Sequence, residues 1–508
     1  MTEKKNVLFM ISDAHRVDHL SCYGNPTLKT PNLDRLADEG VRFTNYFCTN
    51  PICMPNRATL MTGKYPNLHG VRSNGMKLDK DIPTVAQSLK KRGWHTAAVG
   101  KIHHQYWMAP FKRKYTSAEN LISWALDDPG KDPVKENFPL PYYGYEEVEL
   151  VVGNGSICSG HYLEWLEEKS PSVAEEVKKR IPNYDNLFSL FCDDIPGEYY
   201  SSTYIRERII AFLERYRNGD YGEKPFYLHC SFPDPHYPVA PPKKFQEMYQ
   251  PEDIQLPETF NDAEKLYSHP FLGPHLKKPP FKKAFLREAT EEETRKFIAL
   301  TYASVAYIDH CIGEILASLE KLGLAENTIV VYTSDHGDLM GDHGLLFKGP
   351  CPFNGVLQLP FIWRVPDITS PGTVSESLIS SVDYAKTILN LLGIKERYHP
   401  PDMQGKDFSH VLKNPDAEIR DCCYIENDEE IGTLKSRLRH LITKKYKLTI
   451  YQSKPNHGDI YDRINDPLEL HNLWYENSFK EKRYELLNKL LHESLEALGH
   501  SPKRIAGT

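Results

Sequence analysis

Strand-sized apolar runs alternate with helix-patterned segments along this chain, and that alternation limits the possible fold more than any other feature. The first apolar run, residues 6–12, ends at Asp13. Residues 30–39 follow with a Thr-Pro start, apolar residues at helix spacing and a glycine directly after them, and residues 82–92 repeat the pattern before Gly93. Alternation of this kind predicts an α/β fold in which helices sandwich a mostly parallel sheet.

The pattern continues beyond the first hundred residues. We expect further strands at residues 41–47, 96–99, 225–232, 327–334 and 359–364, and further helices at residues 201–217, 291–322 and 382–392. Residues 105–196 and 238–290 are rich in proline and weak in periodicity, which indicates two insertions near the active-site end of the sheet. Residues 1–414 are therefore predicted to form one large domain.

The last part of the chain, residues 415–508, changes character. Residues 441–451 and 458–462 have the pattern of strands in a small antiparallel sheet. Residues 478–498 then carry leucines at helix spacing, which predicts a long helix. We expect a smaller C-terminal α+β subdomain, whose helix could contribute to a homo-oligomer.

Charge and hydropathy exclude several classes of partner. The chain has 508 residues, a formal net charge of -7 and a pI near 6.3, with no long basic run, so nucleic acid is not an expected partner. Its longest apolar runs are strand-sized, so no membrane span is expected. The N-terminal apolar run is too short for the core of a signal peptide, which favours a cytoplasmic location.

Ten cysteines are scattered without a C-x-x-C pair, as expected of free thiols in a reducing compartment, and Cys53 differs from the rest because of its neighbours. It opens a predicted short helix that Gly63 closes. A cysteine at a helix start lies at the positive end of the dipole, and Arg57 adds a cation one turn later. This arrangement suits attack on an oxyanion.

Four predicted strands end in chemistry-bearing residues. The first strand ends at Asp13, and the others lead into a Lys101 and His103 pair, into His236, and into an Asp335 and His336 pair. Ligands of open α/β sheets bind outside the carboxyl ends of the strands, so these side chains are expected at one edge. The sequence therefore predicts a metal site beside an anion site.

The expected metal ligands are Asp13, Asp335 and His336. Their oxygen atoms suit calcium, magnesium or manganese, and the histidine shifts the preference towards manganese or zinc.

Several blocks of the sequence together resemble one known family. They are NVLFMISDAHR at the start, CMPNRATLMTGKYPNLHGV around Cys53, VGKIHH, DPHYP, TSDHGDLMGDHGLLFKG and the closing IYDRINDPLELHNLW. In this order they resemble the type I sulfatases, and Cys-x-Pro-x-Arg resembles that family's signature. The resemblance covers nearly the whole chain, and it implies a core fold similar to that of alkaline phosphatase, with residues 1–414 as the catalytic domain.

The resemblance also implies roles for individual residues. Cys53 would be oxidised to formylglycine by a maturation enzyme, and Arg57 would hold its hydrate in place. The metal would be held by Asp13, Cys53, Asp335 and His336, with Ca²⁺ as the first candidate and Mn²⁺ as the alternative. Sulfate oxygens would be bound by Lys101 and Lys348, the leaving-group oxygen by His236 with Lys348, and the formylglycine hydroxyls would be deprotonated by His103.

Three departures from the family pattern leave the metal and the ester type open. Many sulfatases have Asp-Asp where this chain has Asp13 and Ala14, and many have Asp-Asn where it has Asp335 and His336. The Asp-His pair resembles instead the branch that contains phosphonate monoester hydrolases and choline sulfatases. Asn56 stands where the family usually has a serine.

The predicted function is therefore metal-dependent hydrolysis of a sulfate ester, from a small sulfated sugar or an aryl compound. Hydrolysis of phosphonate monoesters or phosphodiesters by the same nucleophile is the alternative. If Cys53 stayed a thiol, the chain could instead be a metal-holding, anion-binding protein. Asn74, His104 and Trp107 are expected near the pocket as substrate-binding residues.

Overall fold

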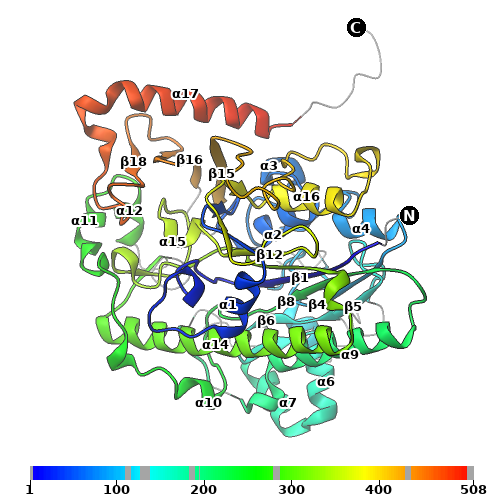
Figure 1. The fold of residues 1–508 in the computed structure, drawn as a ribbon. Helices are drawn as coiled ribbons and strands as arrows, with labels where there is room; N and C mark the ends of the chain where they lie inside the picture. Colours follow the sequence, from blue (N-terminus) through cyan, green and yellow to red (C-terminus); the bar gives the residue numbers. More distant parts are fainter. Residues whose placement is uncertain are drawn as a thin grey trace.

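The structure is a computed structural model, drawn in Figure 1, that describes residues 4–108, 116–125, 138–181, 189–193, 195–277, 286–429 and 436–499. Parts of both predicted insertions and the end of the C-terminal subdomain lie outside these residues. Across the described part, the predicted alternation of strands and helices forms one large sheet with helices on both faces, as Figure 1 shows.

The large sheet is mostly parallel, as the sequence predicts. Five neighbouring strands run in one direction: β10 (Thr328–Ser334), β1 (Asn6–Ser12), β8 (Phe226–Ser231), β4 (His95–Gly100) and β5 (Glu147–Leu150). On the other side of β10, β12 (Phe361–Arg364) runs antiparallel both to it and to β2 (Val41–Phe43), and β13 (Thr373–Ser375) completes this edge parallel to β2. The carboxyl ends of β1, β10, β8 and β4 therefore lie at one edge.

β1 lies in the middle of this sheet, and all seven of its residues are buried. A strand covered on both faces needs an unbroken apolar sequence, which explains why residues 7–11 show no alternation. Val7 pairs with Tyr227 of β8 on one side and with Ile329 of β10 on the other. Burial on every side fixes the position of the residue that follows the strand, Asp13.

Helices cover both faces of the sheet. One face carries α1 (Pro31–Asp38), α9 (Ser201–Asn218) and α14 (Glu291–Lys321), and the opposite face carries α2 (Cys53–Thr62), α3 (Pro66–His69), α4 (Val85–Lys90) and α16 (Asp383–Leu391). α14 begins with a capping box in which Thr290 and Glu293 satisfy each other's backbone N–H groups. α2 ends at Gly63, whose φ of 66° is the left-handed conformation that glycine adopts without strain.

The C-terminal part forms a second, antiparallel sheet. Its order is β15 (Cys422–Glu429), β16 (Ser436–Thr443), β17 (Tyr446–Tyr451) and β18 (Gly458–Asp462), and α17 (Lys480–Ala497) lies over it. Leu486 and Leu490 of α17 pack with Leu441 and Leu448 of the sheet in a core of their own. Other side chains of this sheet, among them Ile442, belong to the main core, so a division of the chain at residue 414 stays a prediction.

Shorter elements fill the insertions and connections. They are β3 (Tyr46–Phe47), α5 (Leu121–Ala125), β6 (Val152–Asn154), β7 (Ile157–Ser159), α6 (His161–Lys169), α7 (Pro171–Arg180), α10 (Lys243–Gln246), α11 (Ala263–Tyr267), α12 (Leu272–Leu276), β9 (Arg287–Glu288), β11 (Leu345–Leu346), α15 (Asn354–Leu357) and β14 (Ile379–Ser380). Among the described helices, none is both long enough and apolar enough to cross a bilayer.

Several predicted boundaries were wrong. Residues 41–47 form two strands, β2 and β3, because β3 leaves the large sheet to pair with β14. Residues 441–451 cover the end of β16, a turn and β17, and β15 was not predicted. β5 adds an edge strand to the large sheet from within the first insertion, where only loops and short helices were expected. Its sequence, EVEL, alternates charged and apolar residues as an edge strand can.

Candidate active site

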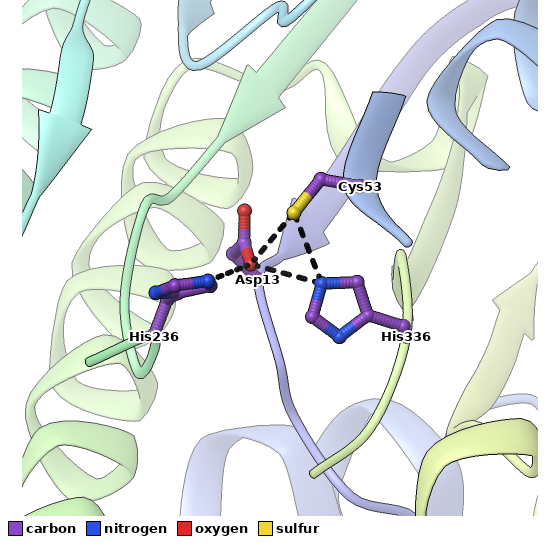
Figure 2. Close-up of side chains that lie close together, drawn as sticks. All are labelled: Asp13, Cys53, His236 and His336. Atoms are coloured by element: carbon purple, nitrogen blue, oxygen red, sulfur yellow. Dashed lines mark hydrogen bonds and ion pairs between the residues drawn. The ribbon is translucent and has the colours of Figure 1, made fainter. Parts of the chain in front are cut away.

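The predicted site residues from four strand ends lie together at the carboxyl edge of the large sheet. Figure 2 shows Asp13, after β1, at the centre of a group with Cys53, His236 and His336. Each of these four presents one potential ligand atom, and the four atoms all lie within 4.8 Å of one another. The parallel strands thus bring together residues that are more than 300 positions apart in the sequence.

Asp13 is fully buried, and positive groups surround it. Its Oδ2 accepts from the Lys101 ammonium group at 2.7 Å and from Arg57 Nη2 at 3.3 Å. Burial alone would raise the pKa of this carboxyl, but Lys101, His236, His336 and Arg57 hold it well below its usual range. Asp13 is therefore ionised and can serve as a metal ligand.

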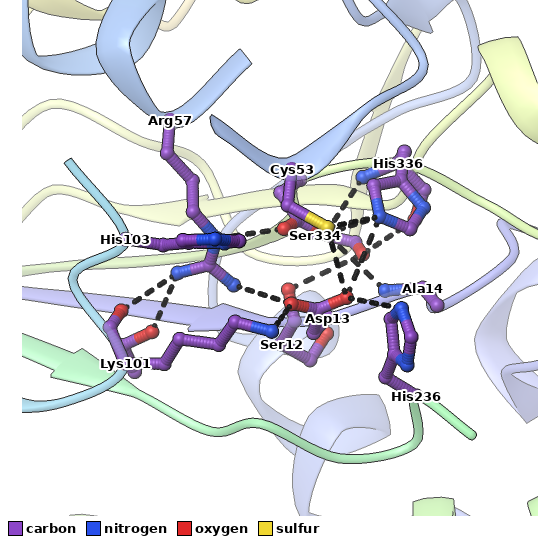
Figure 3. Close-up of polar contacts among 12 residues, drawn as sticks. Ser12, Asp13, Ala14, Cys53, Arg57, Lys101, His103, His236, Ser334 and His336 are labelled. Carbon is purple, nitrogen blue, oxygen red and sulfur yellow. Dashed lines mark hydrogen bonds and ion pairs between the residues drawn. The ribbon is translucent and has the colours of Figure 1, made fainter. Parts of the chain in front are cut away.

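Arg57 bonds both predicted carboxylate ligands, and Figure 3 shows its guanidinium group beside Asp13. Its Nε donates to Asp335 Oδ2 at 2.7 Å, and its Nη1 donates to the Lys101 carbonyl oxygen and to Ser231 Oγ, both at 2.8 Å. The guanidinium group thus fixes Asp13 and Asp335 relative to each other. These contacts position the two carboxylates, and the predicted hold on the hydrate of residue 53 stays a prediction.

Cys53 is the first residue of α2, as the sequence predicts. Its Sγ lies 3.1 Å from His336 Nε2, 2.9 Å from the Lys348 ammonium group and 3.9 Å from Asp13 Oδ1. Burial and Asp13 act to raise the pKa of this thiol, but Lys348 and His336 outweigh them and lower it. In a sulfatase this sulfur would stand in for the oxygen of formylglycine.

Asn56 binds the loop that carries two of the predicted metal ligands, Asp335 and His336. Its Nδ2 donates to the backbone oxygen of Asp335 at 2.6 Å, and its Oδ1 accepts from the Thr49 backbone N–H and from Ser381 Oγ. An asparagine has both a donor and an acceptor, so it can tie α2 to the end of β10 where the family usually has a serine.

The two imidazoles are oriented by backbone carbonyl groups. His336 Nδ1 lies 2.7 Å from the Gly337 oxygen and His236 Nδ1 lies 2.5 Å from the Tyr237 oxygen. A carbonyl oxygen only accepts, so each Nδ1 donates and each Nε2 faces the site. Burial would lower the pKa of His336, but Asp335, Cys53 and Asp13 raise it to about 10. A divalent ion bound there would displace that proton.

Lys348 adds a buried positive charge beside the cluster. Its ammonium group lies 2.7 Å from His336 Nε2, 2.8 Å from His236 Nε2 and 2.9 Å from Cys53 Sγ. Burial lowers the pKa of His236 well below its usual value, and Lys348 lowers it further. Within this pair, the lysine therefore holds the proton.

Lys101 and His103 follow β4. The Lys101 ammonium group joins Asp13 to Asn154 Oδ1, at 2.7 Å and 2.8 Å. His103 is buried, and neither of its ring nitrogens has a hydrogen-bond partner among the described residues. Burial lowers the pKa of His103 well below its usual value, with Lys101 and Arg57 adding to the shift. A neutral imidazole with a free nitrogen can act as a base.

The three predicted substrate-binding residues lie in different settings. Asn74 is half-buried, and its Oδ1 accepts from the Met54 backbone N–H in the first turn of α2. His104 is 1% exposed, with both ring nitrogens unpartnered among the described residues. Trp107 is half-buried against the core. Their contacts with substrate stay predictions.

Two residues at the site carry no strong sequence signal. Glu119 accepts from the backbone N–H groups of residues 103–105, and Asn154 holds Lys101. Both lie in the weakly patterned stretch 105–196, where a single polar residue cannot be told from a surface residue. A large cavity of about 560 Å³ lies elsewhere, lined by Arg16, His19 and other residues, and none of the predicted site residues lines it.

Comparisons with known proteins agree with this geometry. A sequence model of the family described as Sulfatase matches residues 5–394, and another, described as N-sulphoglucosamine sulphohydrolase, C-terminal, matches residues 341–498. The ulvan-active sulfatase of Formosa agariphila is 28% identical over 504 residues, covering 96% of this chain and 81% of that protein. These matches confirm the family that the motifs predicted.

Two solved structures confirm the fold. The phosphonate monoester hydrolase of Agrobacterium radiobacter superposes with a TM-score of 0.77 at 24% identity, covering 98% of this chain and 96% of that one. A structure solved in complex with its substrate D-glucosamine-2-N,6-O-disulfate superposes with a TM-score of 0.71 at 21% identity, covering 97% and 98% of the two chains.

Proposed function

The chain belongs to the sulfatase family and is a sulfuric ester hydrolase, and from that premise we propose that residue 53, converted to formylglycine, is its nucleophile. The observation that carries the proposal is the position of Cys53 Sγ, which lies at the start of α2 within 4 Å of Asp13, His336 and Lys348. A hydrated aldehyde at this position would supply one oxygen to attack sulfur and a second hydroxyl group whose deprotonation expels sulfate.

The donor set fits a divalent metal. Asp13 and Asp335 offer carboxylate oxygens, His336 directs Nε2 to within 3.4 Å of Asp13 and 3.6 Å of Asp335, and residue 53 would add an oxygen. A bound metal would withdraw electron density from the sulfate oxygens and from the oxygen of residue 53. Calcium stays the first candidate, and manganese is the alternative that an imidazole ligand favours.

The chain's own residues divide the proton transfers between them. Lys348, whose pKa is raised by Cys53 and other negative groups against the effect of burial, holds a proton 2.8 Å from His236. This pair would donate a proton to the alcohol oxygen as its bond to sulfur breaks. His103 is neutral, and it would accept a proton from the second hydroxyl group of residue 53. Lys101 and Lys348 would neutralise charge on the sulfate oxygens.

We propose a small sulfated sugar as the substrate. A related enzyme is named for its activity on ulvan, and a structural relative was solved with a disulfated glucosamine. A cytoplasmic enzyme would meet imported mono- or disaccharides rather than polymers, and that location stays a prediction. An enzyme that converts Cys53 to formylglycine is the partner this proposal needs.

Hydrolysis of phosphonate monoesters is the second candidate function. The similarity of the fold to that of a phosphonate monoester hydrolase, and the Asp335 and His336 pair, favour it. Both reactions place a tetrahedral anion between the same lysines, so the substrate distinguishes them better than the site does.

The test combines mass and turnover. The peptide that contains residue 53 of active protein should have the mass of formylglycine rather than cysteine. Turnover of 4-nitrophenyl sulfate and glucosamine 6-O-sulfate should exceed that of a phosphonate monoester. An unmodified thiol in fully active protein would contradict the proposal that formylglycine is the nucleophile. A preference for the phosphonate monoester would instead support the second candidate function.

A further inference from the structure

His103 adopts a backbone conformation that needs support. Its φ is 55°, in the left-handed region that residues other than glycine rarely adopt. Such a residue turns successive backbone N–H groups to the same side and forms a concave site for an anion. The N–H groups of His103, His104 and Gln105 all donate to a single carboxylate, that of Glu119.

The Glu119 carboxylate accepts short hydrogen bonds at both of its oxygens. Oε2 accepts from the His103 N–H at 2.5 Å, and Oε1 accepts from the His104 N–H at 2.8 Å and the Gln105 N–H at 3.1 Å. Oε1 also accepts from the Tyr142 hydroxyl at 2.7 Å. Glu119 is 2% exposed, and a buried carboxylate persists only where donors of this kind replace water.

No other polar contact among the described residues holds the His103 side chain. Both ring nitrogens are without a partner, although Lys101, Arg57 and Asp13 are close enough to influence its charge. The direction of the ring therefore follows from the backbone turn, and the turn is fixed by Glu119. A second set of bonds joins the same two segments, because Gln105 Oε1 accepts from the Ala118 N–H and Ser117 Oγ donates to the Tyr106 oxygen.

We propose that Glu119 is a positioning residue for catalysis, and that its carboxylate holds the 103–105 turn so that the His103 imidazole faces residue 53. The proposal rests on the proposed function, in which His103 accepts the proton whose loss expels sulfate. The Glu119 carboxylate bonds the backbone of the turn and the Tyr142 hydroxyl, and none of its hydrogen bonds among the described residues reaches residue 53. Its loss should therefore slow sulfate release and leave substrate binding largely intact.

The test replaces the carboxylate by its amide. Glu119→Gln puts an NH₂ group opposite backbone donors, so at least one N–H loses its acceptor. We expect kcat for 4-nitrophenyl sulfate to fall about tenfold to a hundredfold and KM to fall with it, so that kcat/KM changes less than about threefold, because only the second step is slowed. Rapid mixing should show a burst of about one equivalent of 4-nitrophenol before slow turnover, because the alcohol leaves before sulfate does.

A double-mutant cycle separates positioning from a general structural effect. In a His103→Ala background, Glu119→Gln should cost less than about twofold, because the group on which it acts is already absent. Glu149→Gln is the matched control, since it changes another glutamate of the same insertion that binds Tyr204 instead. The control should keep kcat within about twofold of wild type.

The outcomes are distinct. Equal losses from Glu119→Gln in the wild-type and His103→Ala backgrounds would overturn the proposal, as would a reduced kcat without a burst. If Glu119→Gln lowers the yield of folded protein, Tyr142→Phe removes one bond to the same carboxylate and should give a smaller loss with the same burst. A wild-type enzyme that cleaves no sulfate ester would refute the proposed function instead.

Discussion

Among the residues that the structure describes, two groups of potential ligand side chains have metal-ligand spacing, and they differ in the hydrogen bonds of their histidines. The first is the cluster of Asp13, Cys53, His236 and His336. The second is formed by His269, His457 and Asp459, where the connection between α11 and α12 meets the C-terminal sheet. His269 Nε2 lies 3.2 Å from Asp459 and 3.4 Å from His457 Nε2.

The two clusters differ in the hydrogen bond that Nδ1 of each histidine makes. In the first cluster, Nδ1 of His236 and of His336 donates to a carbonyl oxygen, which leaves each Nε2 free to face the cluster. In the second, His269 Nδ1 accepts from the backbone N–H groups of Phe271 and Leu272, so Nε2 must carry the hydrogen and donates it to Asp459. Distance alone cannot identify a metal site, because the partner of the second nitrogen decides which atom is free.

The largest expected effect comes from the nucleophile. Cys53→Ala should lower kcat for a sulfate monoester at least about a thousandfold, because no other residue in the cluster can supply the attacking oxygen. His457→Ala in the second cluster should leave kcat within about twofold. Circular dichroism should show both variants folded, and a Cys53→Ala variant with wild-type turnover would show that the first cluster is not the reaction centre.

Metal content gives the next effect. We expect about one divalent ion per chain by elemental analysis, removed by His336→Ala and by prolonged chelation together with activity. His269→Ala should still carry one ion per chain. Two ions in wild type and one in His269→Ala would contradict this distinction between the two clusters, because the second cluster would then be a metal site.

Substitutions in the second cluster should lower the stability of the protein more than its activity. Asp459 is fully buried and accepts from His269, from Asn472 Nδ2 at 2.6 Å and from the Tyr451 hydroxyl. Asp459→Ala leaves several buried donors without an acceptor and should lower the free energy of unfolding by roughly 1–3 kcal/mol. Chemical denaturation measures this, and Asp262→Ala, at a more exposed carboxylate, is the control that should change it far less.

The smallest effect is a change in the pH dependence of stability. Burial lowers the pKa of His457 below 6.5, and although Asp459 opposes this shift, His269 and Lys454 add to it. The unfolded chain thus binds a proton at this residue more readily than the folded chain does. The free energy of unfolding is therefore higher above about pH 6.5, where His457 is neutral in both states, and it falls as the pH drops through that value. Between pH 7 and pH 5, Tm should fall less in His457→Gln than in wild type. An identical slope would show that His457 does not contribute.

The sequence predicted the parts of the site that follow strongly patterned strands. Asp13 and Asp335 come directly after β1 and β10, whose unbroken apolar runs identify them as buried parallel strands. The order of strands in the sheet could not be predicted, but it was not needed, because every parallel strand ends at the same edge. Cys53 was identifiable for a similar reason, since it starts a helix that a glycine closes.

The remaining parts of the site and of the fold depend on contacts between segments that lack a regular hydrophobic pattern. Glu119 and Asn154 act through single hydrogen bonds to residues far from them in the chain, and no periodicity marks such a residue. β5 and β15 were missed because charged side chains interrupt their apolar pattern. His269 shows that distances in the structure can also mislead, since its distance from His457 and Asp459 alone would indicate a metal ligand.

The near-complete enclosure of residue 53 limits when it can be modified. Its side chain is 2% exposed, and the pocket that encloses it needs β10, which starts at Thr328. A ribosome adds about 5–20 residues per second, so on the order of tens of seconds pass between the synthesis of residue 53 and that of β10. A converting enzyme would have at least this interval before the pocket can close, and slower synthesis of the middle of the chain should raise the fraction of matured molecules.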